Sequence, residues 1–157
     1  MFLTDAHRKQ IGAWLAGLSE RVEWLQRLSQ RSDPWEEDLT WRLAAERALH
    51  TSVEYVTDVS SLIIDALVMR DPGGYADIVK VLVEEQVLDA QWFESFAGIF
   101  DLRTKLLRDH AQVAANEVRQ AVERYANQFS PLSIRSKHTS SDTAHRIAHT
   151  SVRLSGI

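Results

Sequence analysis

The stretch FAGIFDLRTKLLRDH (96–110) predicts a helix whose inner face changes from aromatic to cationic along its length. The members of this face recur at intervals of three and four residues: Phe96, Phe100, Arg103, Leu107 and His110. An unpaired charge is costly to bury, so an arginine set into an apolar stripe is expected to be paired, to lie at an interface or to bind an anion. We therefore expect the rest of the chain to hold this helix in place.

Apolar residues at the same spacing predict four further helices around this stretch. The five expected helices cover residues 5–30, 34–69, 75–85, 90–110 and 114–128. Thr4, Asp33 and Asp89 are the expected N-caps, with Pro34 at the first position of the second helix. Pro72 and the glycine pair after it separate the second helix from the third. No segment alternates polar and apolar residues as a strand would, so the fold class is all-α, an antiparallel bundle of four to five helices.

Length and charge indicate one acidic domain followed by a basic tail. A chain of 157 residues is long enough for a single core and too short for two ordinary ones. Residues 1–129 hold 14 Lys and Arg against 21 Asp and Glu, whereas residues 130–157 hold four against one and are rich in Ser, Thr and His. We assign residues 1–129 to the bundle and residues 130–157 to a basic C-terminal tail. An acidic body argues against broad nucleic-acid binding but leaves room for a small basic site.

Several classes of site are absent from the sequence. Without cysteine there is no disulfide, no thiolate nucleophile and no Cys-based zinc site. The start MFLTDAHRKQ lacks the pattern of a signal peptide and the apolar runs are too short to span a bilayer, so we expect a cytoplasmic protein with no membrane segment. There is no glycine-rich phosphate loop, GxSxG elbow or HExxH motif, and we expect no cofactor and no metal. One alternative is a zinc site in the tail, where Asp142, His145 and His149 could share a helical face.

Arg103 and His110 are the residues that predict a chemistry. Seven residues apart on a continuous helix, they would share a face and lie about 10 Å apart along its axis. Arginine holds a phosphate in its planar fork and histidine transfers protons near neutral pH, which together suit phosphodiester chemistry. RNA supplies its own nucleophile in the 2′-hydroxyl, so such a site needs no metal. The alternative is a helix end decorated with cations that complement the helix dipole.

A resemblance to a known family rests on three segments: ERALHTSVEYVTDVSSLII (46–64), MRDPGGYADIVKVLVEEQVL (69–88) and FDLRTKLLRDH (100–110). Through them residues 40–127 resemble the HepT-like branch of the HEPN helical-domain family, minimal proteins encoded beside MNT nucleotidyltransferases. The resemblance implies a five-helix bundle that dimerises, with the two motif helices forming a shared RNA cleft. Active members carry an Arg-polar-x-x-x-His-x-Tyr motif and are metal-independent endoribonucleases. Several are toxins, silenced when the partner nucleotidyltransferase adenylylates the motif tyrosine.

This chain departs from the family motif at two positions. Arg103 takes the arginine slot and Thr104 the polar slot, but Arg108 takes the histidine slot and His110 the tyrosine slot. The wider family also tolerates six residues between arginine and histidine, which Arg103 and His110 satisfy. One hypothesis is therefore an endoribonuclease toxin with catalytic Arg103 and His110, and with Thr104, Lys105 and Arg108 binding the substrate. The other is a dimer without catalysis that binds RNA, a nucleotide or a protein.

The same stretch predicts a homodimer. Phe96, Phe100 and a charged residue on one face are expected at a symmetric interface, where Asp101 or Asp109 of a second copy could pair with Arg103. An MNT nucleotidyltransferase antitoxin and RNA are the other partners that the resemblance implies.

Overall fold

The computed structural model describes residues 2–129, and all regular structure in this range is helical. The elements in chain order are α1 (Asp5–Ser29), η1 (Trp35–Glu37), α2 (Leu39–Leu67), α3 (Tyr75–Glu84), α4 (Ala90–Phe96), α5 (Gly98–Arg108), η2 (His110–Gln112) and α6 (Ala115–Tyr125). No strand occurs between residues 2 and 129. The expected all-α fold is confirmed, with α4 and α5 together taking the place of the single fourth helix.

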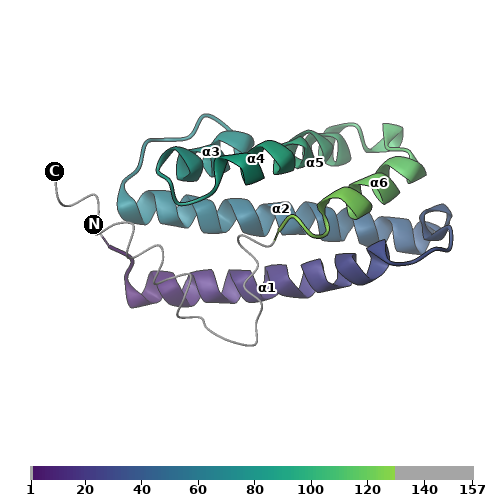
Figure 1. Ribbon diagram of the computed structural model, residues 1–157, viewed down its shortest axis with the longest axis horizontal. Helices are drawn as coiled ribbons and strands as arrows, with labels where there is room; N and C mark the ends of the chain where they lie inside the picture. Colours follow the sequence, from purple (N-terminus) through teal and green to yellow (C-terminus); the bar gives the residue numbers. More distant parts are fainter. Residues whose placement is uncertain (1, 130–157) are drawn as a thin grey trace.

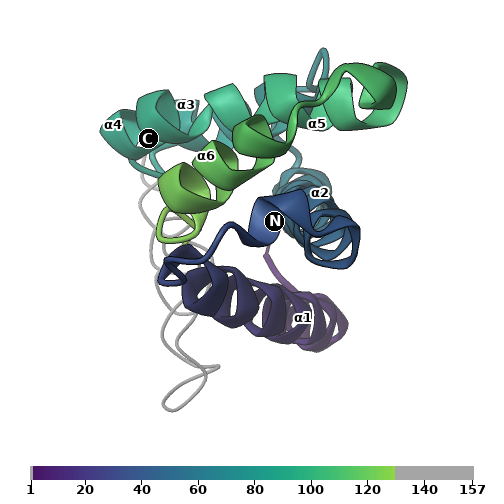
Figure 2. The ribbon, with the colours of Figure 1, turned by 90° about the vertical axis from the view of Figure 1, so that its right-hand side faces the viewer.

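The long helix α2 forms the centre of the bundle. It runs antiparallel to α1 on one side, while α3, α4 and α5 run back along its other side (Figure 1). The view along the bundle shows α6 between these two sides, in contact with α1, α2 and η1 (Figure 2). α1 and α5 therefore lie on opposite sides of α2.

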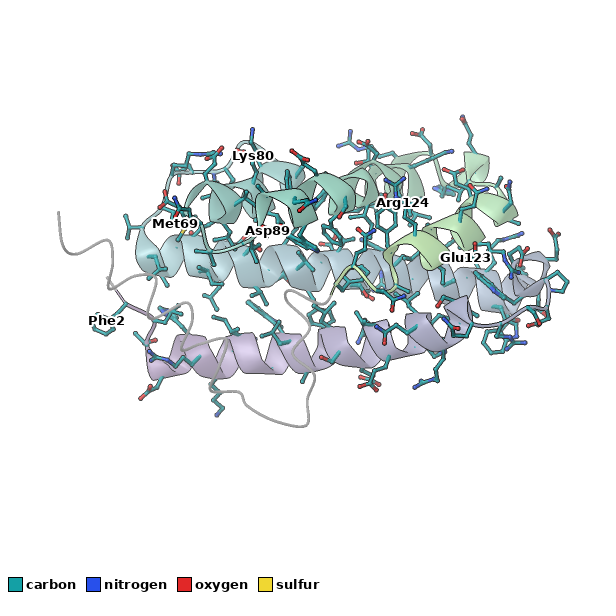
Figure 3. The ribbon with its side chains drawn as sticks, in the orientation of Figure 1. Phe2, Met69, Lys80, Asp89, Glu123 and Arg124 are labelled. Atoms are coloured by element: carbon teal, nitrogen blue, oxygen red, sulfur yellow. The ribbon has the colours of Figure 1, made fainter. Side chains whose placement is uncertain are left out.

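The first helix follows its predicted caps and stripe. The Thr4 hydroxyl accepts from the backbone N–H of His7, and the His7 ring accepts from the backbone N–H of Thr4. Side chains fill the space between α1 and α2, whereas Phe2 and Lys80 point away from the bundle (Figure 3). The buried apolar stripe of α1 consists of Ile11, Leu15, Leu18, Val22, Leu25 and Leu28.

The start of the second helix differs from the prediction. Asp33 does not cap it, because both carboxylate oxygens of Asp33 accept from the Arg31 guanidinium, at 2.8 and 2.6 Å. The chain instead makes the short turn η1, which buries Trp35 in the core. α2 begins at Leu39, and Asp38 caps it by accepting from the two backbone N–H groups that follow.

The turn that joins α2 to α3 is held by side-chain hydrogen bonds. Val68 ends α2 in the left-handed conformation, with φ 53°. The Arg70 guanidinium then donates to both carboxylate oxygens of Asp77 at 2.8 Å, and the backbone N–H of Gly73 donates to the same carboxylate at 2.8 Å. These contacts fix the point at which α3 begins, and its first residue is Tyr75.

The aromatic half of the opening stretch lies in the core of the single chain. Phe96 is fully buried, and its ring contacts the rings of Trp92, Phe100, Tyr125 and Phe129, with centroids 4.8 to 6.3 Å apart. The expectation that Phe96 and Phe100 lie at an interface between copies is therefore wrong, because α6 and α4 already cover them.

The cationic half of the stretch ends as a helix sooner than expected. α5 stops at Arg108, and His110 begins the separate turn η2. Leu107 is exposed rather than continuing the buried stripe. Within residues 2–129, no helix combines the length and the apolar character that crossing a bilayer requires.

Candidate active site

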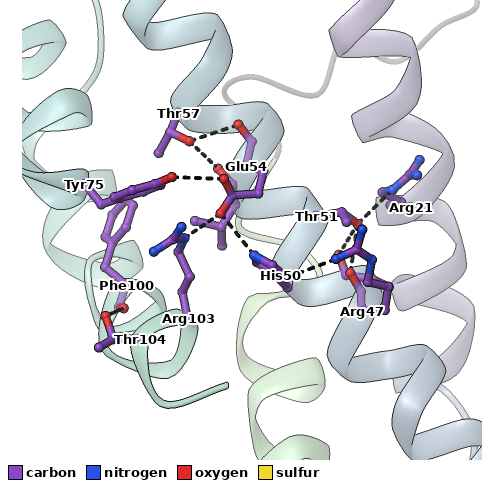
Figure 4. Close-up of polar contacts among 12 residues, drawn as sticks. Arg21, Arg47, His50, Thr51, Glu54, Thr57, Tyr75, Phe100, Arg103 and Thr104 are labelled. Carbon is purple, nitrogen blue, oxygen red and sulfur yellow. Dashed lines mark hydrogen bonds and ion pairs between the residues drawn. The ribbon is translucent and has the colours of Figure 1, made fainter. Parts of the chain in front are cut away.

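Arg103 points from α5 towards α2 and forms an ion pair there. Its Nε donates to Oε1 of Glu54 at 2.5 Å, and its side chain is only 13% exposed (Figure 4). The arginine thus has the partner that its burial requires, but from its own chain. The expected pairing with Asp101 or Asp109 of a second copy is replaced by this contact with Glu54.

The Tyr75 ring covers the other side of the same guanidinium. The central carbon of Arg103 lies 3.4 Å from the ring centroid, and the Tyr75 hydroxyl donates to Oε2 of Glu54 at 3.1 Å. Burial, followed by the nearby Glu54 carboxylate, raises the pKa of the Tyr75 hydroxyl. That hydroxyl is therefore a hydrogen-bond donor at neutral pH, and carboxylate and ring together restrict the guanidinium to one orientation.

His50 joins this group from one helical turn before Glu54. Its Nε2 lies 3.2 Å from Oε1 of Glu54, and its Nδ1 lies 3.4 Å from Nη1 of Arg47. Figure 4 shows the resulting chain of contacts across α2, from Arg47 through His50 and Glu54 to Arg103 and Tyr75. We call these five residues the polar cluster. It brings together α2, the start of α3 and the motif helix α5.

His110 lies further along the same face of α2. Burial raises the pKa of the Glu46 carboxyl, and the positive charges of Arg42 and His110 partly oppose this effect. Since Glu46, His50 and Glu54 follow at four-residue intervals on α2, they form one stripe. Because α5 runs antiparallel to α2, Arg103 lies against Glu54 at one end of this stripe, and His110 lies near Glu46 at the other end.

The three expected substrate-binding residues point in different directions. The Thr104 hydroxyl donates to the carbonyl of Phe100 within α5, at 3.1 Å. Lys105 binds both carboxylate oxygens of Glu117 on α6, at 2.8 and 2.7 Å. Arg108 is exposed and makes no ion pair with any residue that the structure describes.

Lys105 lies in a surface groove away from the polar cluster. A groove of about 310 Å³ runs between α5 and α6, lined by Gly98, Asp101, Leu102, Lys105, Glu117, Gln120, Ala121, Arg124 and Tyr125. Arg103 is not part of its lining. The structure therefore places Lys105 and Arg103 on separate sides of the motif helix.

The sequence indicated only Arg103 among the five members of the polar cluster. Arg47, His50, Glu54 and Tyr75 were not among the expected site residues. A signal for two of them was present, because His50, Glu54 and Asp58 repeat at four-residue intervals along the second helix. Burial, followed by repulsion from Glu54, raises the pKa of Asp58, so the stripe behaves as one set of interacting charges.

No metal centre occurs in the part of the chain that the structure describes, since residues 2–129 contain no group of three or more His, Asp or Glu side chains placed to hold an ion. The suggested set of Asp142, His145 and His149 lies outside the described residues, as does the whole basic tail.

Comparison with known proteins identifies the family of this chain. The family model described as "Ribonuclease HepT-like" matches residues 18–135, which is most of the chain. The chain belongs to this family. The resemblance inferred from the three sequence segments is thereby confirmed.

Two comparisons with one bacterial protein agree with this assignment. The HepT-like chain is 29% identical over 104 residues to the protein of Bacillus subtilis (strain 168) named "Putative RNase YutE", an overlap of 65% of this chain and 72% of that protein. The solved structure titled "Structure of Cytosolic Protein of Unknown Function YutE from Bacillus subtilis" matches with a TM-score of 0.72 at 22% identity, over 100% of this chain and 98% of that one. At this identity the structural likeness shows the fold.

Proposed function

We propose that this HepT-like chain is a metal-independent endoribonuclease that uses the 2′-hydroxyl of RNA as its nucleophile. The observation that carries the proposal is the state of Arg103, the motif arginine. Only its Nε bonds to Glu54, and its two terminal nitrogens make no hydrogen bond to the described residues. The edge of the fork that binds phosphate oxygens therefore keeps unused donors, while ring and carboxylate hold the guanidinium in place.

In this proposal Arg103 binds the scissile phosphate and the charge that develops on it. His110 carries a proton during the reaction, since its side chain is exposed and no helix constrains its approach to the substrate. Thr104 and Arg108 contact the RNA backbone next to the phosphate. Lys105 takes part only if it leaves Glu117.

The family also suggests a biological setting. We propose that the protein is a cytoplasmic toxin paired with an MNT nucleotidyltransferase antitoxin encoded next to it. The motif tyrosine is replaced by His110, so the antitoxin has no tyrosine to adenylylate at that position. A neighbouring nucleotidyltransferase gene whose product co-purifies with this chain would support the pairing, and its absence would contradict it.

A homodimer is part of the same proposal. Three leucines are exposed at the end of the bundle where α2 begins and α5 ends: Leu39, Leu43 and Leu107, at 57%, 53% and 45% (Figure 1). Exposed leucines in one region favour association with a second surface. Because His110 follows α5 at this end, the second copy would border the candidate site.

The test is RNA cleavage by purified protein in the presence of EDTA. Wild type is expected to cut single-stranded RNA, leaving a 2′,3′-cyclic phosphate and a 5′-hydroxyl, and not to cut the 2′-deoxy analogue. Arg103→Ala is expected to lose about 10²- to 10³-fold in rate, the usual effect of removing a group that stabilises developing negative charge. Arg27→Ala, on α1 across α2 from the site, is the matched arginine control.

The outcomes separate the two functional hypotheses. Cleavage by wild type that Arg103→Ala abolishes supports the endoribonuclease. Wild type that binds RNA and leaves it intact at every pH tested would refute catalysis and favour the RNA-binding alternative. Equal cleavage by wild type and Arg103→Ala would point to a contaminating nuclease.

A further inference from the structure

Arg108 takes the usual histidine slot of the motif and His110 lies two residues further on, yet a second imidazole stands beside Arg103. His50 comes from α2 and lies 3.2 Å from the same Glu54 oxygen, Oε1, that Arg103 contacts at 2.5 Å. Imidazole and guanidinium therefore meet at a single atom. Nε2 of His50 and Nε of Arg103 are therefore no further apart than the sum of these two contacts.

We infer that His50 is the general base of this site and takes the role that a histidine at position 108 would have in the usual motif. The inference rests on the proposed ribonuclease function and assigns it a further catalytic residue. It places the proton acceptor on α2, outside the family motif. His110 is then left to serve the other proton transfer of the reaction.

The contacts of His50 select one tautomer. Arginine has only donors, so the 3.4 Å contact between Nη1 of Arg47 and Nδ1 of His50 requires a lone pair on Nδ1. Nε2 then carries the hydrogen and donates it to Glu54. A carboxylate that orients one ring nitrogen while the other accepts a proton is the arrangement by which catalytic triads position their histidine.

The base nitrogen can become accessible to substrate. Arg47, its present partner, is an exposed residue on the outer side of α2, with a long side chain that can move away. The His50 side chain is 17% exposed and that of Glu54 is 29% exposed, so the imidazole ring is partly accessible to solvent. When displaced, the Arg47 guanidinium stays close enough to bind a phosphate of the same RNA strand.

The reaction balances with the two histidines in separate roles. Nδ1 of His50 takes the proton of the 2′-hydroxyl as the 2′-oxygen forms its bond to phosphorus. The bond from phosphorus to the 5′-oxygen breaks, and protonated His110 gives its proton to that leaving oxygen. Arg103 holds the non-bridging oxygens throughout. Solvent then returns the proton from His50 to His110, and no oxidant, reductant or metal is consumed.

The test compares His50→Gln with wild type in the EDTA cleavage assay. Glutamine can still donate to Glu54 but cannot accept and release a proton, so the variant separates catalysis from positioning. We expect kcat to fall by about 10²- to 10⁴-fold, the usual contribution of a general base, with RNA affinity changed by less than about threefold. His7→Gln, in the first turn of α1, is the matched control, and circular dichroism verifies the fold of each variant.

The pH profile supplies a readout that a structural role would not change. Wild-type kcat/KM is expected to rise and then fall with pH. His50→Gln should lose the rising limb, because its base is gone, and His110→Gln should lose the falling limb, because its acid is gone. A His50→Gln profile parallel to that of wild type would overturn the inference.

A measurement on the resting protein separates failure of the inference from failure of the proposed function. Nitrogen-15 NMR of wild type is expected to show His50 protonated at Nε2 and unprotonated at Nδ1, and Glu54→Gln should weaken that preference. Active wild type with fully active His50→Gln would overturn the role of His50 and keep the ribonuclease. Inactive wild type would overturn both, and the opposite tautomer would overturn the role of His50 alone.

Discussion

At the scale of single residues, Glu54 organises the candidate site. Its carboxylate receives hydrogen bonds from Arg103 and Tyr75 and faces the imidazole of His50. Three elements therefore meet at one side chain. The Arg70–Asp77 ion pair holds the turn before α3, whose first residue is Tyr75. This pair therefore helps to position Tyr75 against Glu54.

Asp77→Asn is expected to change how stability depends on pH. The Arg70 guanidinium, followed by the Gly73 N–H, holds the pKa of Asp77 well below its usual range. The carboxylate thus stabilises the fold above its ordinary pKa of about 3.9, and this contribution is lost as the pH falls through the lower folded pKa. Wild type should melt at a higher temperature than Asp77→Asn at pH 7, and the difference should shrink by pH 2.5.

Thermal melts between pH 7 and pH 2.5 check this expectation. Asp71→Asn, next to Arg70 in sequence, is the matched control for losing one surface carboxylate. A difference between wild type and Asp77→Asn that stays constant or grows towards low pH would contradict the assigned ion pair.

The sequence predicted local residue roles better than distant ones. Thr4 and Asp89 act as the expected caps, because a cap depends on the next three residues. Asp33 does not, because Arg31 competes for its carboxylate. The Arg103–Glu54 pair joins residues 49 apart in sequence, so no local pattern could indicate it. The expected shared face of Arg103 and His110 required one continuous helix through residue 110. In the structure α5 ends at Arg108, which the spacing of apolar residues did not indicate.

At the scale of elements, α1 and α2 lie so close that one glycine is required between them. A Cβ on Gly17 would lie 2.6 Å from the ring carbon and the hydroxyl of Tyr55 on α2, closer than packed atoms allow. Gly12, one and a half turns earlier in the same helix, has no atom within 4 Å of the same position. The Tyr55 ring also lies under the Arg21 guanidinium, 5.0 Å from the centroid, so it has little room to yield.

Alanine at these two positions is expected to act in opposite directions. Gly12→Ala should raise the free energy of unfolding by about 0.5–1 kcal/mol, the usual gain from replacing an exposed helical glycine. Gly17→Ala gains the same propensity but overpacks the contact with Tyr55, at a cost of about 1–3 kcal/mol, and should be net destabilising. Urea denaturation measures both. Stabilisation by both replacements would mean that α1 and α2 are further apart than described.

At the scale of the whole molecule, apolar surface and candidate chemistry occur at the same end. The exposed leucines of α2 and α5 lie where η2 carries His110. A bundle that buries its aromatic stripe internally has no need of a partner to complete its core. The proposed dimer would use this outer surface.

Leu43→Asp is expected to convert the proposed dimer to a monomer. A charge at the centre of an apolar contact is costly to bury, while the same charge on a solvated monomer surface costs little. Light scattering at micromolar concentration should give wild type twice the mass of one chain and Leu43→Asp the mass of one. Val68→Asp, an exposed apolar position at the other end of α2, is the control. A monomeric wild type would refute the dimer.

The separation of Glu54 from Arg103 along the chain also bears on the timing of synthesis. The ribosome makes α2 first, so the Glu54 carboxylate has no Arg103 guanidinium to pair with until 49 more residues have been added. A nascent or truncated chain that ends before α5 therefore displays an acidic helix with no phosphate-binding group beside it. For a protein proposed to cut RNA, the site becomes complete only after α5 has been made and has packed against α2.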